Sequence, residues 1–126
     1  MVLHSQFQDF ILFLYIHMAI SDGTLHSSEE QVILNKMTKL FPTEIDIKKK
    51  LQLAVIEYKA LDSVMTMNVI RESFMHFDKV TFAQKYKVYA DMYDIVNADG
   101  KVEESEKNAL NGLKEIIDMN AQMRQS

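Results

Sequence analysis

Apolar residues recur every three or four positions along almost the whole chain, and this spacing limits the fold more than any other feature. Side chains at that spacing share one face of an α-helix, whereas a strand needs alternation with a period of two. No stretch sustains such alternation, and one proline and three glycines leave few breaks. The sequence therefore predicts an all-α fold, a single compact bundle of about six or seven helices formed by residues 1–126.

Breaks and capping residues set the expected helix ends. The first helix runs from Phe7 to about Met18, before Ser21, and the second ends at Phe41-Pro42, because proline disfavours helical geometry in the residue before it. Expected N-caps are Ser27 (with Glu30 at capping-box spacing), Thr43 and Asp62 for the next three helices. A fifth helix follows Asp78-Lys79, a sixth begins near Glu103 or Glu104, and the chain frays from about Gln122. The predicted inner faces of the second to sixth helices are Ile33, Met37 and Leu40; Ile47, Leu51, Ala54, Val55 and Tyr58; Met67, Ile70, Phe74 and Phe77; Tyr86, Tyr89, Ala90, Tyr93 and Val96; and Leu110, Leu113, Ile116 and Ile117.

The motif Asp-Gly-x-(Leu/Val)-x-x-x-Glu occurs twice between helical stretches. The first corner runs from Asp22 to Glu29 and the second from Asp99 to Glu106. Two of the three glycines lie here, where a helix that ends in a sharp turn favours the left-handed backbone region open to glycine. The repeat predicts two pseudo-symmetric helix-corner-helix pairs in contact, with the third and fourth helices bracing them.

The corner carboxylates have two interpretations. In the structural one, each aspartate accepts backbone N–H bonds within its turn, and each glutamate stabilises the first turn of the next helix. In the functional one, the carboxylates bind a divalent cation, since hard oxygen ligands suit Ca²⁺, Mg²⁺ or Mn²⁺ and suit Zn²⁺ less well. Both interpretations need the glycine, so only the carboxylates distinguish them.

Each corner matches the second half of an EF-hand loop, but the first half differs. The residue at the first ligand position would be Met18 in one copy and Ile95 in the other, and neither can supply the usual carboxylate. We therefore expect one shared site in place of two EF-hands. Its candidate ligands are Asp22, Glu29, Asp99 and Glu106. Residues near them in sequence are His17, His26, Asp94 and Asn97.

The segment from Ile95 to Glu106 resembles the signature of the TerB-like family, which is associated with tellurite resistance. The segment from Ala19 to Glu29 is similar, although Ile20 and Ser21 replace the Asn97 and Ala98 of the second copy. The resemblance implies a small cytoplasmic helical bundle that binds a divalent metal through Asp22, Glu29, Asp99 and Glu106. It also implies a role in a stress-response or membrane-associated complex, without enzymatic chemistry.

The composition limits the classes of partner, chemistry and location that we expect for this chain. A net charge of −4 and a pI near 5.5 disfavour nucleic acid, which needs a clustered positive field. The absence of cysteine excludes disulfides and thiolate chemistry. The longest apolar run, residues 10–16, is too short to span a bilayer, and it lacks the flanks of a signal peptide, so we expect a cytoplasmic protein.

These observations lead to two hypotheses for the function, a metal-binding module and a protein-interaction scaffold. The first is a metal-responsive TerB-like module with unidentified protein partners. The alternative is an interaction scaffold, a homodimer or a helix-binding adaptor, whose corners are purely structural. A carboxylate–metal hydrolase is a third and weaker hypothesis, because it requires an open coordination position that the sequence does not reveal, and the chain has no His-Glu-x-x-His motif. No enzymatic activity is expected.

Overall fold

The computed structural model describes residues 6–20, 25–77, 82–97, 107–108 and 110–115. All regular structure within these ranges is α-helical, as predicted. The helices are α1 (Phe7–Ala19), α2 (Ser27–Leu40), α3 (Ile47–Lys59), α4 (Ser63–His76) and α5 (Phe82–Val96). Residues 107–108 and 110–115 are helical too. No helix in the described part of the chain is both long enough and apolar enough to cross a membrane.

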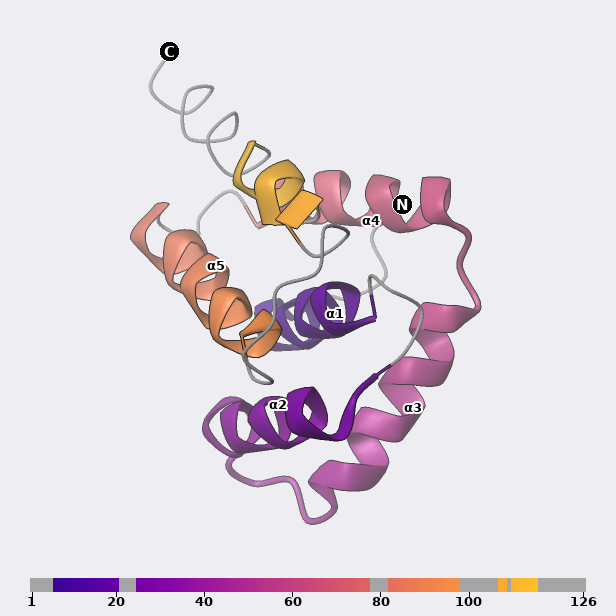
Figure 1. Cartoon of the computed structure of the whole chain (residues 1–126), viewed down its shortest axis with the longest axis vertical. Helices are drawn as coiled ribbons and strands as arrows, with labels where there is room; N and C mark the ends of the chain where they lie inside the picture. Colours follow the sequence, from indigo (N-terminus) through magenta and orange to yellow (C-terminus); the bar gives the residue numbers. More distant parts are fainter. Residues whose placement is uncertain (1–5, 21–24, 78–81, 98–106, 109, 116–126) are drawn as a thin grey trace.

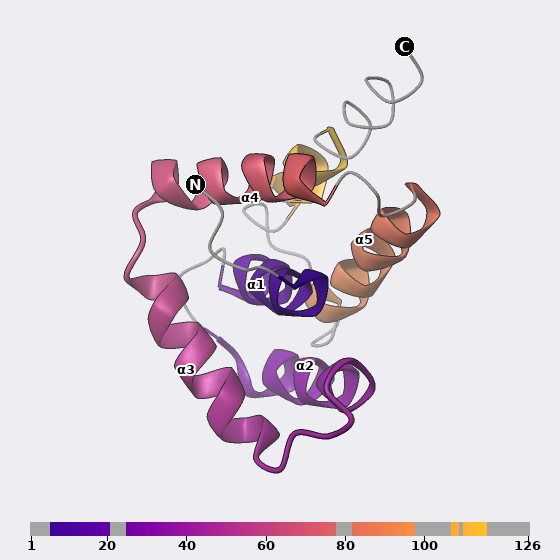
Figure 2. The same cartoon turned by 180° about the vertical axis from the view of Figure 1, so that it is seen from behind.

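The first helix is the centre of the bundle. Figures 1 and 2 show α1 in the middle, with α2, α3, α4 and α5 arranged around it. Every residue from 10 to 16 is buried, as are Met18, Ala19 and Ile20. A helix that is apolar on all sides is stable only when neighbours cover all of them. The run of residues 10–16 thus marks the central helix and not merely a helix with one inner face.

Aromatic rings join α4 to this central helix. The ring of Phe10 packs edge-on against Phe74, with centroids 5.1 Å apart, and stacks on Phe77 at 5.7 Å. Phe7 meets Phe77 at 5.3 Å. Ile70 and Phe74 are buried and Phe77 is partly buried, so the predicted inner face of α4 is confirmed there. Such ring pairs add roughly 0.5–1.5 kcal/mol each beyond the area they bury.

Of the three predicted N-cap residues, the structure confirms one and replaces two. Asp62 caps α4, accepting a hydrogen bond from the Met65 N–H at 2.8 Å. The prediction of Thr43 as the cap of α3 is wrong, because Asp46 accepts from the Lys49 N–H at 3.0 Å and the helix begins three residues later than expected. The N-cap of α2 is His26 and not Ser27.

The predicted inner face of α5 is wrong at two positions. Tyr93 is 52% exposed and Ala90 is also exposed, whereas Val88, Met92 and Ile95 are buried. Both stripes have helical spacing, so periodicity alone could not separate them. The aliphatic stripe turns inward because it has no polar atom to satisfy, while a tyrosine can keep its hydroxyl in water.

The other predicted inner-face residues pack against the core wherever the structure describes their side chains. Ile33, Met37 and Leu51 are buried on α2 and α3, and Leu110 and Leu113 are buried in the last helical segment. Ile116, Ile117 and the whole second corner lie outside the described residues. The pseudo-symmetry of the two helix pairs therefore stays a prediction.

Candidate functional site

Of the four predicted metal ligands, the structure describes Glu29; Asp22, Asp99 and Glu106 lie outside the described residues. Glu29 occupies the first turn of α2 and is only 2% exposed. Its Oε1 accepts a hydrogen bond from the backbone N–H of His26 at 3.4 Å. The carboxylate thus stabilises the start of α2, as the structural interpretation predicted, one residue earlier than the expected Ser27–Glu30 pair.

Two apolar residues, one on each side of the first Asp-Gly motif in the sequence, also pack into the bundle. Ile20, the C-cap of α1, is 7% exposed, and Leu25 is partly buried against the core. The described residues on both sides of this motif therefore pack against the core. A carboxylate is rarely buried to this extent unless hydrogen bonds or a cation stabilise it.

The helices that flank the two corners contact one another. α1 leads into the first corner, α2 leads out of it, and α5 leads into the second; α1 contacts both α2 and α5, and α2 contacts α5. Among the described residues, no group of three His, Asp or Glu side chains could hold a metal ion. Asp22, Asp99 and Glu106 lie outside those residues, so the shared site stays a prediction.

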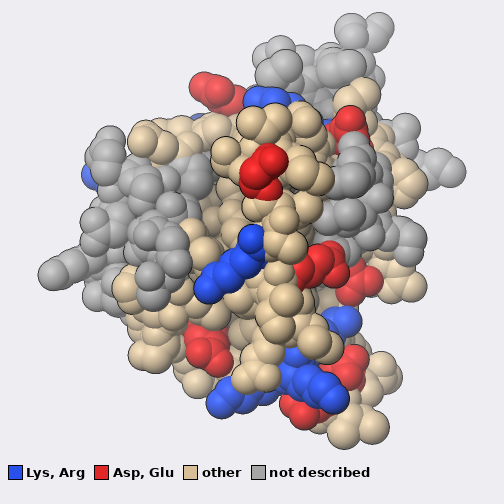
Figure 3. Space-filling model, turned by 90° about the vertical axis from the view of Figure 1, so that its right-hand side faces the viewer, with Lys and Arg blue, Asp and Glu red and all other residues tan. Residues whose placement is uncertain are grey.

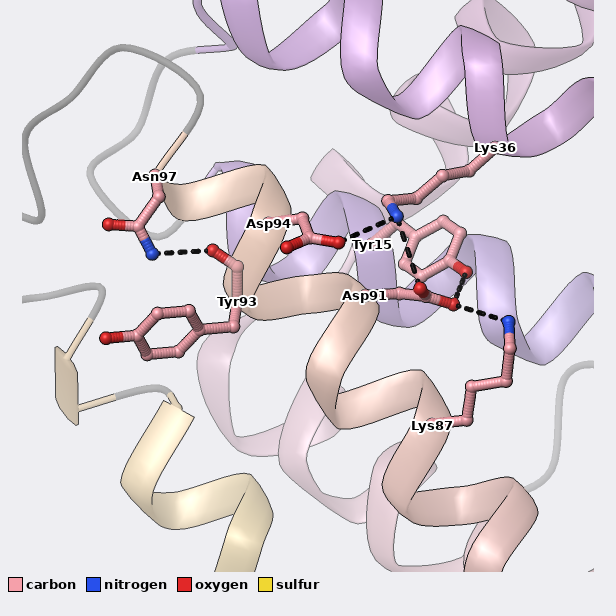
Figure 4. Close-up of polar contacts among 7 residues, drawn as sticks. All are labelled: Tyr15, Lys36, Lys87, Asp91, Tyr93, Asp94 and Asn97. Carbon is pink, nitrogen blue, oxygen red and sulfur yellow. Dashed lines mark hydrogen bonds and ion pairs between the residues drawn. The ribbon is translucent and has the colours of Figure 1, made fainter.

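A polar network on α5 joins the three helices (Figure 4). The ammonium group of Lys36, on α2, donates to Asp91 Oδ1 at 3.2 Å and to Asp94 Oδ2 at 3.3 Å. Asp91 Oδ2 accepts from the hydroxyl of Tyr15, on α1, at 3.1 Å and from Lys87 at 3.5 Å. We call Tyr15, Lys36, Lys87, Asp91 and Asp94 the Lys36 network.

The members of the Lys36 network differ widely in exposure. The side chains of Lys36 and Asp91 are 19% and 21% exposed, whereas those of Lys87 and Asp94 are 79% and 65% exposed. Tyr15 is 2% exposed. Burial, followed by the negative charge of Asp91, raises the pKa of the Tyr15 hydroxyl far above its ordinary value, so the hydroxyl stays protonated and donates. The network has balanced charges and joins three helices, which suits a structural strut.

Three residues near the corners in sequence have structural partners. Asp94 belongs to the Lys36 network, and the Asn97 side-chain amide donates to the Tyr93 carbonyl at 2.8 Å, closing the last turn of α5. His17 Nδ1 lies 2.9 Å from the hydroxyl of Tyr58, on α3. Burial lowers the pKa of His17 to about 4, so the imidazole is neutral at physiological pH.

Sequence reasoning missed the Lys36 network. Its members on different helices are 55, 58 and 76 residues apart, so no local motif connects them. The only local signal was the spacing of Lys87 and Asp91, which lie four positions apart on one helix. That pair alone predicts an exposed surface contact and not a junction between three helices.

A family model for the tellurite resistance protein TerB matches residues 8–126. The chain belongs to the TerB family. The match includes both corners and all five named helices apart from Phe7, the first residue of α1, so the resemblance inferred from the corner motifs is confirmed. No curated protein and no solved structure shows a significant match to this TerB family member. The family assignment therefore comes with no residue roles transferred from a characterised relative.

Proposed function

We propose that this chain is a non-enzymatic, cytoplasmic TerB module that binds a divalent cation through Asp22, Glu29, Asp99 and Glu106. The observation that carries the proposal is the burial of Glu29, which is 2% exposed at the first corner. A cation is one of the few partners that offset the loss of hydration of a buried carboxylate. The long 3.4 Å hydrogen bond from His26 is compatible with a second interaction at the same carboxylate.

The chemistry of the donors decides the class of ion. All four proposed ligands are carboxylates, which favour hard cations such as Ca²⁺, Mg²⁺ and Mn²⁺ over Zn²⁺. Four carboxylates in one place would repel one another, and a divalent cation would remove much of that repulsion. Contacts among α1, α2 and α5 support such convergence, because these helices lead into and out of the corners.

Calorimetric titration of the metal-free protein with Ca²⁺, Mg²⁺, Mn²⁺ and Zn²⁺ tests the proposal. We expect saturable binding of at least one hard cation, weakened about tenfold or more by Asp22→Asn, Glu29→Gln or Asp99→Asn, since each change removes a charged ligand. The matched control is Glu30→Gln, which makes the same chemical change next to Glu29. Absence of saturable binding at submillimolar metal, or equal binding by all variants, would contradict the proposal.

A second candidate function, the interaction scaffold, is favoured by a different observation. Large apolar side chains are exposed on α3 and at the start of α4, including Leu53 at 58%, Ile56 at 66% and Val64 at 68%. Exposed apolar patches on small domains commonly bind other proteins. A scaffold role within a stress-response or membrane-associated complex, as the family resemblance implies, is compatible with metal binding at the corners.

A further inference from the structure

The outward face of α3 has an apolar centre with opposite charges at its two ends. Lys49, Leu53, Ile56, Glu57 and Ala60 are all exposed, and their spacing of three or four residues puts them on one side of the helix. We call these five residues the α3 stripe. Figure 3 faces this side of the molecule and shows uncharged side chains along its middle, interrupted by a basic side chain, with basic and acidic side chains together at the lower end.

The inner face of α3 packs against the core, but its outward face exposes large apolar side chains. Leu51 is its only buried residue, while Leu53 and Ile56 are more than half exposed. Ile45, just before the helix, is 100% exposed, and Val64, at the start of α4, is 68% exposed. Apolar side chains therefore continue beyond both ends of the α3 stripe. Burying them against a partner would be favourable at roughly 25 cal/mol per Å² of apolar surface.

Several charges of α3 oppose its dipole, although the Asp46 N-cap and Lys59 in the last turn favour it. Lys48, Lys49 and Lys50 lie in the first turns, where the helix dipole is positive, and no acidic residue lies in the first turn. Glu57 lies near the other, negative end. Lys50 turns toward its own fold, pairing with Asp9 at 3.5 Å and lying over the Phe41 ring at 4.5 Å. Among the described residues, Lys48 and Lys49 make no ion pair.

We infer that the α3 stripe binds a second copy of this chain, with the two α3 helices antiparallel about a two-fold axis near Leu53. Lys49 and Glu57 each lie four residues from Leu53, about 6 Å along the axis in opposite directions. The two-fold axis thus brings Lys49 of one copy to Glu57 of the other, twice, as an isologous interface requires. Each lysine also reaches the negative end of the facing helix, where the dipole is favourable.

Lys59 does not interfere with this arrangement. It lies six residues after Leu53, about 120° around the helix, and is therefore on the flank of the stripe. The contact is also short, because 13 helical residues extend only about 20 Å. Stable interfaces bury roughly 800 Å² per partner, so we expect a reversible dimer with rapid exchange. The dimer is independent of the proposed metal site.

Sedimentation analysis of the full chain over a wide concentration range tests the dimer. We expect a reversible monomer–dimer equilibrium, whose dissociation constant Leu53→Asp raises about tenfold or more, because two charges would enter the centre of the interface. Met75→Asp is the matched control, since Met75 is 59% exposed on α4, outside the stripe, and the change should leave the equilibrium unaltered. A wild-type chain that is monomeric at every concentration, or a Leu53→Asp variant that dimerises normally, overturns the inference.

A charge exchange tests the antiparallel register. Lys49→Glu should weaken the dimer roughly three- to tenfold, because it replaces two attractive pairs with two repulsive ones. The double variant Lys49→Glu/Glu57→Lys should recover most of the affinity, since opposite charges again face each other. A double variant that dimerises no better than Lys49→Glu alone overturns this register.

Discussion

At the scale of single residues, His17 links stability to pH. Its imidazole packs beside Tyr58 with the rings 5.9 Å apart, and burial lowers its pKa to about 4. In the unfolded chain the pKa returns to about 6.5. Between these two values the unfolded chain binds a proton that the native state excludes. This contribution to stability is therefore complete above pH 6.5 and is lost as the pH falls toward 4.

We predict that replacing His17 by glutamine flattens this part of the pH profile. The wild-type chain should lose up to about 3 kcal/mol of unfolding free energy more than His17→Gln between about pH 7 and pH 4. Urea unfolding of both proteins across that range measures the difference and cancels the shared effect of the carboxylates. His76→Gln is the control, because His76 is exposed at the end of α4. Equal pH slopes for wild type and His17→Gln would contradict the prediction.

At the scale of helices, the Lys36 network fixes α5 against α2 and α1. Lys36→Met removes the ammonium group that lies between Asp91 and Asp94, which then repel each other one turn apart on α5. Because Lys36 and Asp91 are mostly buried, we expect a loss of about 1–2 kcal/mol of unfolding free energy, between the values for exposed and buried pairs. Chemical denaturation measures the loss.

Lys87→Met supplies the matched control for this prediction. Lys87 contacts the same Asp91 at 3.5 Å but is 79% exposed, so its removal should cost less than about 0.5 kcal/mol and lose its effect at high salt. If both substitutions destabilise equally, Lys36 is not the strut of the network.

The same elements show what the sequence could predict. Asp62 and the inner residues of α4 were identifiable because caps and helical periodicity act within a few residues. The inner face of α5 was not, since its tyrosine and aliphatic stripes have the same spacing and only packing selects between them. For the candidate site, the sequence identified Glu29 as a corner residue but not its burial. Of the Lys36 network it indicated only the Lys87–Asp91 pair, because the other partners meet only through tertiary packing.

At the scale of the whole molecule, metal binding makes the stability of the fold depend on the concentration of the cation. Dimerisation makes it depend on the concentration of the protein. A cation that binds only the native state adds RT ln(1 + [L]/Kd), about 2.7 kcal/mol at a hundredfold excess over Kd. A dimer stabilises the fold through the concentration of the protein itself. Thermal unfolding can therefore separate metal binding from self-association in one set of measurements.

We predict that the two dependences are lost independently. Asp99→Asn should reduce the rise in Tm with Ca²⁺ or Mn²⁺ while leaving the rise in Tm with protein concentration, because the α3 stripe is intact. Leu53→Asp should do the reverse, because the corners are intact. Thermal unfolding followed by circular dichroism, at several metal and protein concentrations, gives both slopes for each variant. If either substitution removes both dependences, metal binding and self-association share one structural transition, and the corners and the α3 stripe are coupled through the central helix.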